Sequence, residues 1–156
     1  MAHWAQLTSN KVNNPALINL IRKTYGLKAL RHWDRIYWCI DLHDVIIEGK
    51  YNKYNEGRTL APFCAEVFQV LRGHDENCTI LWTSSHNGPI MDMRKWLIGK
   101  GVTFDYINAN PECPDNELCS FDHKFYFNIC LDDKSGFSWK EDWKDIYELL
   151  VTEVYP

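Results

Sequence analysis

Apolar runs alternate with helical patterns along this chain. Four runs are typical of buried strands, and they cover residues 36–40, 78–82, 102–107 and 125–131. Apolar residues recur at helical spacing in four further stretches, residues 14–26, 60–72, 88–99 and 139–151. Strands that alternate with helices indicate βαβ units. The pattern predicts an α/β fold, a three-layer Rossmann-like parallel sheet flanked by helices, without a large cap domain.

The first helix precedes the first strand and has clear end signals. Asn14 is a good N-cap, Pro15 suits the first helical position, and Gly26 predicts the C-cap. We expect this helix to pack on the sheet or cover its edge, and the alternative is an extension that binds a partner. The chain is therefore divided into an N-terminal extension with one helix, residues 1–33, and an α/β domain, residues 34–156.

Composition narrows the class of protein. The 156 residues are 46% hydrophobic and carry a net charge of -4, so the overall charge does not argue for nucleic-acid or membrane partners. No signal peptide or membrane span is expected. Six cysteines without a Cys-x-x-Cys pair favour a reduced, cytoplasmic protein. Cys113, Cys119 and His123 could bind zinc, although their spacing also fits ordinary loop residues.

Polar residues that carry chemistry follow three of the predicted strands. Asp41 follows the first strand, Thr83 the second, and Asp132 and Asp133 the fourth. In parallel sheets ligands collect at the carboxyl ends of the strands. Carboxylates from separate strands suit Mg²⁺, and Lys124 would balance the charge of a phosphate. The pattern indicates a phosphoryl-transfer site, or else polar residues that end their strands independently.

The order of these motifs resembles one enzyme superfamily. Asp-Leu-His-Asp-Val at residues 41–45, Ile-Leu-Trp-Thr at 80–83, and Lys124 eight residues ahead of Asp132-Asp133 together resemble the haloacid dehalogenase phosphohydrolases. The resemblance covers roughly residues 36–150. It is strongest to small, capless members of bacterial or phage type, so a phage protein would act in the host cytoplasm.

The resemblance implies a mechanism and a set of roles. Asp41 would be the nucleophile that forms an aspartyl-phosphate, which water then hydrolyses. Asp41, Asp132, Asp133 and the backbone carbonyl of His43 would bind Mg²⁺ as the cofactor. The phosphoryl group of the substrate would be bound by Thr83, Ser84 and Lys124.

His43 departs from the pattern. Hydrolytic members usually have a second aspartate two residues after the nucleophile, where it protonates the leaving group and activates water. Histidine can do general acid-base chemistry near neutral pH, so we predict a catalytic role for His43. The alternative is a catalytically weakened binding or regulatory protein. Asp44 could replace the missing acid, although its side chain is expected to point away.

The substrate is predicted only by class. Without a large cap the site should be open to a phosphorylated small molecule or to a nucleic-acid end. Tyr51, Lys53, Tyr54 and Arg58 could stack on a base and contact phosphate, or they could belong to a packed flap.

Overall fold

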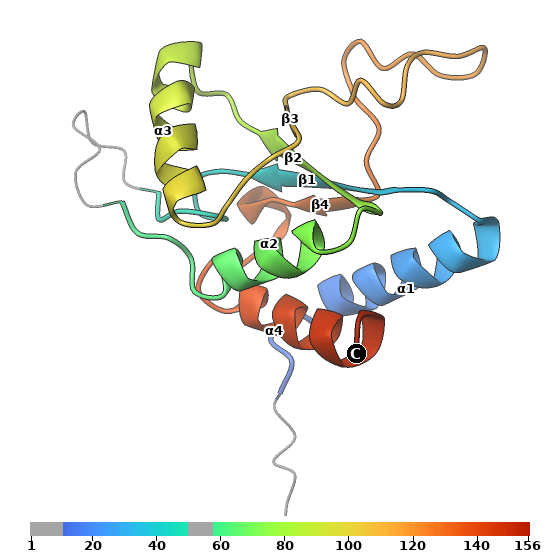
Figure 1. The fold of residues 1–156 in the computed structure, drawn as a ribbon, viewed down its shortest axis with the longest axis horizontal. Coiled ribbons are helices and arrows are strands. Elements are labelled where there is room, and N and C mark those ends of the chain that lie inside the picture. The colour runs from blue at the N-terminus through green and yellow to red at the C-terminus, as the bar shows by residue number, and fades with distance from the viewer. Residues whose placement is uncertain (1–10, 50–57) are drawn as a thin grey trace, which may run out of the picture.

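A four-stranded parallel sheet organises the part of the chain that the computed structural model describes, residues 11–49 and 58–156 (Figure 1). Its strand order is β3-β2-β1-β4, and the bounds are β1 Ile36–Asp41, β2 Asn77–Trp82, β3 Tyr106–Ile107 and β4 Ile129–Leu131. The flanking helices are α1 Pro15–Arg31, α2 Cys64–Arg72, α3 Asn87–Gly99 and α4 Asp142–Leu149. The predicted Rossmann-like α/β class is confirmed, and these residues contain no large cap domain.

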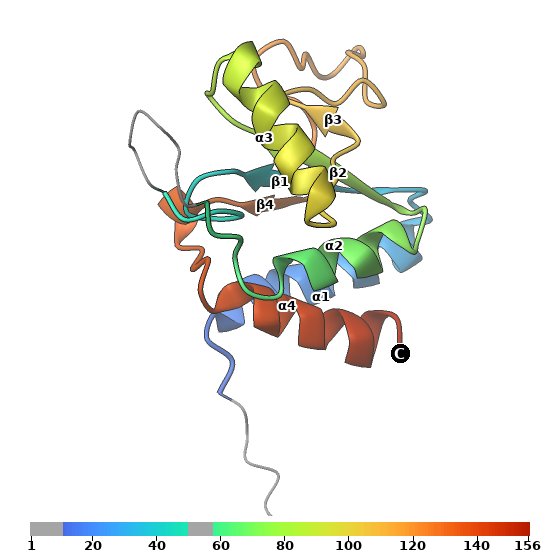
Figure 2. The same ribbon diagram turned by 60° about the vertical axis from the view of Figure 1, so that its left-hand side comes forward.

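The two faces of the sheet are covered differently. Trp38 and Ile40 of β1 point into the main core, which also contains the buried residues of all four helices. Figures 1 and 2 show α1, α2 and α4 side by side, with α3 apart from them near β2 and β3. The opposite face presents Tyr37 and Cys39, and residues 108–128 supply Phe125 to cover it. We call residues 108–128 the covering segment.

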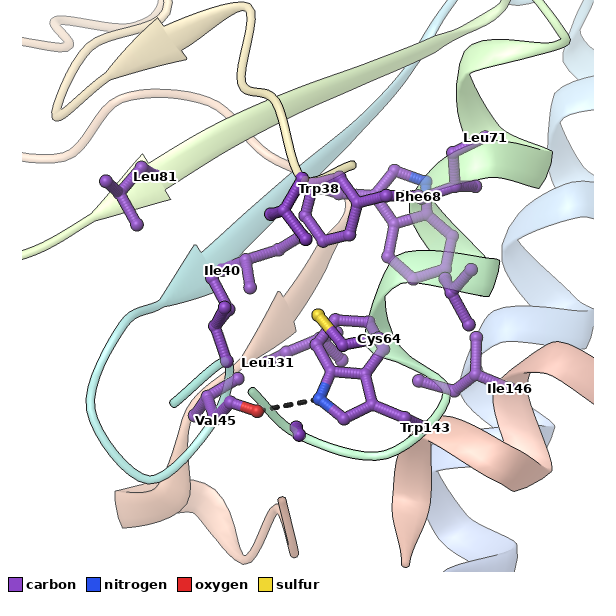
Figure 3. Packing of buried hydrophobic residues seen from close by; sticks show 14 of the residues in the cluster. Trp38, Ile40, Val45, Cys64, Phe68, Leu71, Leu81, Leu131, Trp143 and Ile146 are labelled. Atoms are coloured by element: carbon purple, nitrogen blue, oxygen red, sulfur yellow. Dashed lines mark hydrogen bonds between the residues drawn. The ribbon is translucent and has the colours of Figure 1, made fainter. Parts of the chain in front are cut away.

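The main core also holds the loop that follows β1. Residues 42 and 45–47 of this loop are almost fully buried. The indole Nε1 of Trp143 in α4 donates a hydrogen bond of 2.7 Å to the backbone carbonyl of Val45 (Figure 3). A loop anchored by buried side chains and by a buried hydrogen bond keeps a fixed shape. The position of His43 is therefore set by packing on both sides of it.

Two strands are shorter than their apolar runs predict. In the third run only Tyr106–Ile107 pairs with β2, and the Asp105 carboxylate instead accepts a hydrogen bond of 2.8 Å from the Thr79 N–H. In the fourth run only Ile129–Leu131 pairs with β1. There the Asn128 side chain accepts a hydrogen bond of 2.8 Å from the Tyr37 N–H. At both places a side-chain oxygen takes one bond of the ladder, while the backbone N–H groups of Asp105 and Asn128 still donate to the carbonyls of Thr79 and Tyr37 at 2.9 Å. Regular pairing begins one residue later.

Helix ends also differ from the sequence prediction. The predicted C-cap at Gly26 is wrong, because α1 continues to Arg31 and Lys28 forms an ion pair of 2.7 Å with Glu76 beyond that glycine. Helix α2 begins at Cys64 rather than near residue 60, because Phe63 has a positive φ of 64°. Helix α4 is followed by a π-helical turn, Leu150–Val154. Within the described part of the chain, none of the helices combines the length and apolar character needed to cross a membrane.

The first helix is built into the fold. It contacts β1, β4 and α4, and it buries Ile18 and Ile21. The side-chain amides of Asn13 and Asn14 donate hydrogen bonds of 2.8 Å and 3.0 Å to the carboxylate of Asp142, which is 1% exposed at the beginning of α4. These bonds satisfy a buried carboxylate.

Candidate active site

The carboxyl edge of the sheet carries a row of side chains on the face that the covering segment occupies. The register pairs Asp41 of β1 with Trp82 of β2, and it pairs Ile40 with Leu131 of β4. Asp132 therefore follows as the neighbour of Asp41, since its backbone is still extended with φ -144° and ψ 131°. Because side chains alternate between faces, these three lie on the same face as Cys39. The order across the edge is Trp82, Asp41, Asp132.

Three carboxylates meet at this edge. Asp41, Asp132 and Asp133 each contribute one oxygen atom, and the three oxygens lie within 4.8 Å of one another. In residues 11–49 and 58–156 no other group of three or more His, Cys, Asp or Glu side chains is arranged to hold a metal ion, so Cys113, Cys119 and His123 do not form one. The structure thus brings together the acids that the sequence predicted to meet.

The three carboxylates of the cluster repel one another, because they bring like charges close together. Partial burial, together with the charges of Asp132 and Asp133, raises the pKa of Asp41 to about 6, although a hydrogen bond of 2.8 Å from the Leu42 N–H acts in the opposite direction. A hydrogen bond of 2.9 Å from the Lys134 ammonium lowers the pKa of Asp133. The backbone N–H of Lys134 also donates to Asp132 at 2.8 Å. A bound cation would relieve the remaining repulsion.

The donor set fits Mg²⁺. This ion prefers oxygen ligands at about 2.0–2.1 Å in octahedral geometry, so ligands on opposite sides of it lie roughly 4.2 Å apart. Three oxygens within 4.8 Å reach that arrangement through small side-chain rotations. Asp41, Asp132 and Asp133 are therefore the residues that would hold the ion. The backbone carbonyl of His43 lies in the anchored loop directly after Asp41.

Asp44 has a structural role in that loop. It adopts a positive φ of 57°, which aspartate tolerates better than most residues, and its carboxylate accepts a hydrogen bond of 2.8 Å from the Gly49 N–H. A Cβ atom at position 49 would collide with this carboxylate, so glycine permits the close approach. His43, beside it, is partly buried and bridges to Ile47 through the backbone.

Thr83 is held by a residue that the sequence analysis missed. The Asn108 side chain accepts a hydrogen bond from the Thr83 N–H and donates one to the Thr83 carbonyl, both at 2.8 Å. The Thr83 hydroxyl donates to the Ser85 hydroxyl at 3.1 Å, and Ser84 between them is exposed. Asn108 follows β3 with a positive φ of 53°. An asparagine directly after a predicted strand is the signal that could have identified it.

The lysine that contacts the acids is Lys134. Its ammonium lies 2.9 Å from Asp133, whereas the Lys124 ammonium lies 5.9 Å from the centre of the Phe127 ring. The adjacency of Lys134 to the Asp-Asp pair was the available signal. In the predicted flap, residues 51, 53 and 54 lie outside the described residues. Arg58 is described, and its guanidinium lies over the Trp96 ring at 6.0 Å.

Comparison with known proteins supports the fold. A solved structure of a conserved protein from Bacteroides thetaiotaomicron is similar, with a TM-score of 0.57 and 20% sequence identity. The similarity covers 78% of this chain and 98% of that chain. No protein-family model and no curated protein match the sequence. At this identity the likeness shows a shared fold.

Proposed function

We propose that this protein is a Mg²⁺-dependent phosphohydrolase of the haloacid dehalogenase type, which acts through an aspartyl-phosphate. The observation that carries the proposal is the approach of the Asp41, Asp132 and Asp133 carboxylates within 4.8 Å at the carboxyl edge of a parallel sheet. The order of the motifs along the chain supports it independently, because it resembles that superfamily.

Asp41 is the proposed nucleophile. The Leu42 N–H engages its Oδ1 atom and orients the carboxylate, which leaves Oδ2 to attack phosphorus. A new bond forms between Oδ2 and phosphorus while the ester oxygen leaves, and water then hydrolyses the aspartyl-phosphate. Bound Mg²⁺ would supply the positive charge that lets an anionic carboxylate approach an anionic phosphate. The same charge would keep Asp41 deprotonated at neutral pH.

Lys134, Thr83 and Ser84 are the proposed phosphate-binding groups. Lys134 brings an ammonium group to the carboxylates, and its side chain is 82% exposed, so it can turn towards an incoming phosphate. The Thr83 hydroxyl lies one residue beyond the register partner of Asp41. Lys124 remains the alternative lysine, since it is exposed on the covering segment and next to Phe125, which contacts Trp82.

His43 is the proposed acid-base residue. It would donate a proton to the leaving oxygen and then accept one from the attacking water. The anchored loop supports this role, because its packing fixes the backbone at His43, two residues after the proposed nucleophile. The second candidate function, a weakened binding or regulatory protein, follows from the same position, since an aspartate is usual there in hydrolytic relatives.

Phosphate release from p-nitrophenyl phosphate tests the proposal. We expect release that requires Mg²⁺ and that Asp41→Asn abolishes. Asp92→Asn is the matched control, because it neutralises an exposed carboxylate on α3. His43→Ala should slow turnover and change its pH profile. Turnover that survives Asp41→Asn, or that needs no divalent ion, contradicts the proposal. Binding of Mg²⁺ without turnover at any pH supports the weakened protein instead.

A further inference from the structure

A cavity of about 460 Å³ lies at the carboxyl end of β2, one strand away from Asp41. One wall is Trp82, the register partner of Asp41 in the neighbouring strand and on the same face of the sheet. The other walls come from the covering segment. The walls include Trp82, Asn108, Phe121, Asp122, His123 and Phe125. The cavity is therefore next to the proposed nucleophile and within the size range of small-molecule sites.

Three aromatic rings, those of Trp82, Phe121 and Phe125, line this cavity and pack on neighbouring rings. Trp82 is 43% exposed, which is unusual for so large an apolar side chain at the end of a buried strand. Its ring packs against the buried ring of Phe125 at 5.4 Å, and Phe125 packs on Phe127 at 6.0 Å. Phe121 is held by Tyr126 at 6.3 Å. Rings fixed in this way offer apolar area at little cost in conformational entropy.

The rim of the cavity is polar. Asp122 and His123 are exposed there and together offer hydrogen-bond acceptors and a hydrogen-bond donor. Asn108 also lines the cavity while both atoms of its amide hold Thr83. The wall of the cavity and the proposed phosphate-binding threonine are thus joined by one side chain. A ligand in the cavity would lie beside a phosphate on Asp41.

A larger hollow of about 710 Å³ offers no such combination. It is lined by α2 residues such as Gln69 and Arg72 and by Lys100, and none of the described residues that line it is aromatic. Its lining also includes Gly73, which follows α2 and comes shortly before the amino end of β2. It therefore extends to the amino edge, away from the carboxylates.

We propose that the cavity at Trp82 binds the base of a nucleoside monophosphate whose phosphate is attacked by Asp41. This inference rests on the proposed function. A planar ring matches the aromatic walls, a base with polar edges matches Asp122 and His123, and the sugar would span the step from Trp82 to Asp41. Stacking on an aromatic side chain strengthens the binding of a base by about tenfold.

Binding of two phosphates that differ by the base tests the inference. Adenosine monophosphate and ribose 5-phosphate are titrated calorimetrically into Asp41→Asn protein with Mg²⁺, so that neither is consumed. We expect the nucleotide to bind at least about tenfold more tightly. Adding Trp82→Ala or Phe121→Ala should weaken nucleotide binding about tenfold and leave ribose 5-phosphate unchanged, whereas Trp82→Phe should keep most of the affinity. Leu118→Ala is the control, because this residue of the same segment is 93% exposed.

The outcomes separate this inference from the proposed function. Equal affinity for the two phosphates, or nucleotide binding that neither Trp82→Ala nor Phe121→Ala weakens, overturns the base site. If the unmutated protein still hydrolyses p-nitrophenyl phosphate in that case, the proposed function stands alone. Base-dependent binding that Trp82→Ala abolishes, in a protein without Mg²⁺-dependent turnover, supports the base site and contradicts the proposed function.

Discussion

The two edges of the sheet use polar side chains in opposite ways. At the amino edge Asn77 is buried and central to a hydrogen-bond network. Its carbonyl oxygen accepts from the Tyr25 hydroxyl at 2.6 Å, and its amide donates to the Tyr155 hydroxyl at 3.0 Å. Glu76 beside it is paired with Lys28 at 2.7 Å and also accepts from Tyr155. Donors and acceptors in this network are matched, so its polar groups stabilise the fold.

At the carboxyl edge the charges are not matched. Three carboxylates gather there, and the ammonium of Lys134 contacts one of them. Such an arrangement costs stability when no cation is bound, since like charges in a partly buried place repel. Polarity alone therefore does not identify a site. A cluster whose charges remain unbalanced, beside an open cavity, indicates ligand binding better than a satisfied network does.

The largest expected effect separates activity from stability at the carboxyl edge. Asp41→Asn should lower turnover about a thousandfold or more, because it removes the proposed nucleophile. In EDTA the same change should raise the free energy of unfolding by about 1 kcal/mol, because it removes one of three crowded charges. Steady-state kinetics and urea unfolding measure the two effects. A variant that is both inactive and less stable would contradict this description of the edge.

At the amino edge we expect a substitution to lower stability and to leave turnover unchanged. Asn77→Ala leaves buried groups of Tyr25 and Trp38 without their acceptor, so we expect a loss of about 3 kcal/mol in the free energy of unfolding. Turnover per folded molecule should stay unchanged. The exposed Asn19→Ala on α1 is the control and should change stability by less than about 0.5 kcal/mol. A specific loss of turnover in Asn77→Ala would mean that the edges are coupled.

Magnesium should stabilise one edge only. At about ten times its dissociation constant, Mg²⁺ should add about 1.4 kcal/mol to the free energy of unfolding. The gain should persist in Asn77→Ala and disappear in Asp132→Asn. Thermal unfolding with and without the ion measures it. Equal stabilisation of the Asp132→Asn variant would show that the ion binds elsewhere.

The smallest expected effect concerns pH. Burial alone would raise the pKa of Glu76, but hydrogen bonds from Lys28 and Tyr155 outweigh it and lower that pKa below its ordinary value of 4.5. A lowered carboxylate pKa stabilises the fold above the unfolded value, and the gain is lost as pH falls through the folded value. Glu76→Gln should therefore be less stable than the native protein at pH 7, and the difference should shrink below pH 4.5. If the stability difference between Glu76→Gln and the native protein grew as the pH fell, the lowered pKa of Glu76 would be contradicted.

The order of the elements and the residues at the strand ends could be predicted from the sequence. Apolar runs and helical spacing are local signals that predict the strands and helices. Because the carboxyl ends of parallel strands lie at one edge of the sheet, the residues that follow those strands are also predicted to lie at that edge. For that reason Asp41 and Asp132 could be predicted to meet although they are far apart along the chain. The apolar residues 42 and 45–47 after β1 can be read from the sequence, but the hydrogen bond from Trp143 of α4 that anchors this loop is a tertiary contact.

Tertiary packing set the contact partners of the individual side chains. It made Lys134 rather than Lys124 the lysine at the carboxylates, carried α1 past Gly26, and used Asn108 to hold Thr83. It also placed the covering segment against Trp82, which creates the cavity. None of these follows from periodicity, because each depends on contacts between stretches whose separation in space is set only when the sheet and its helices pack together.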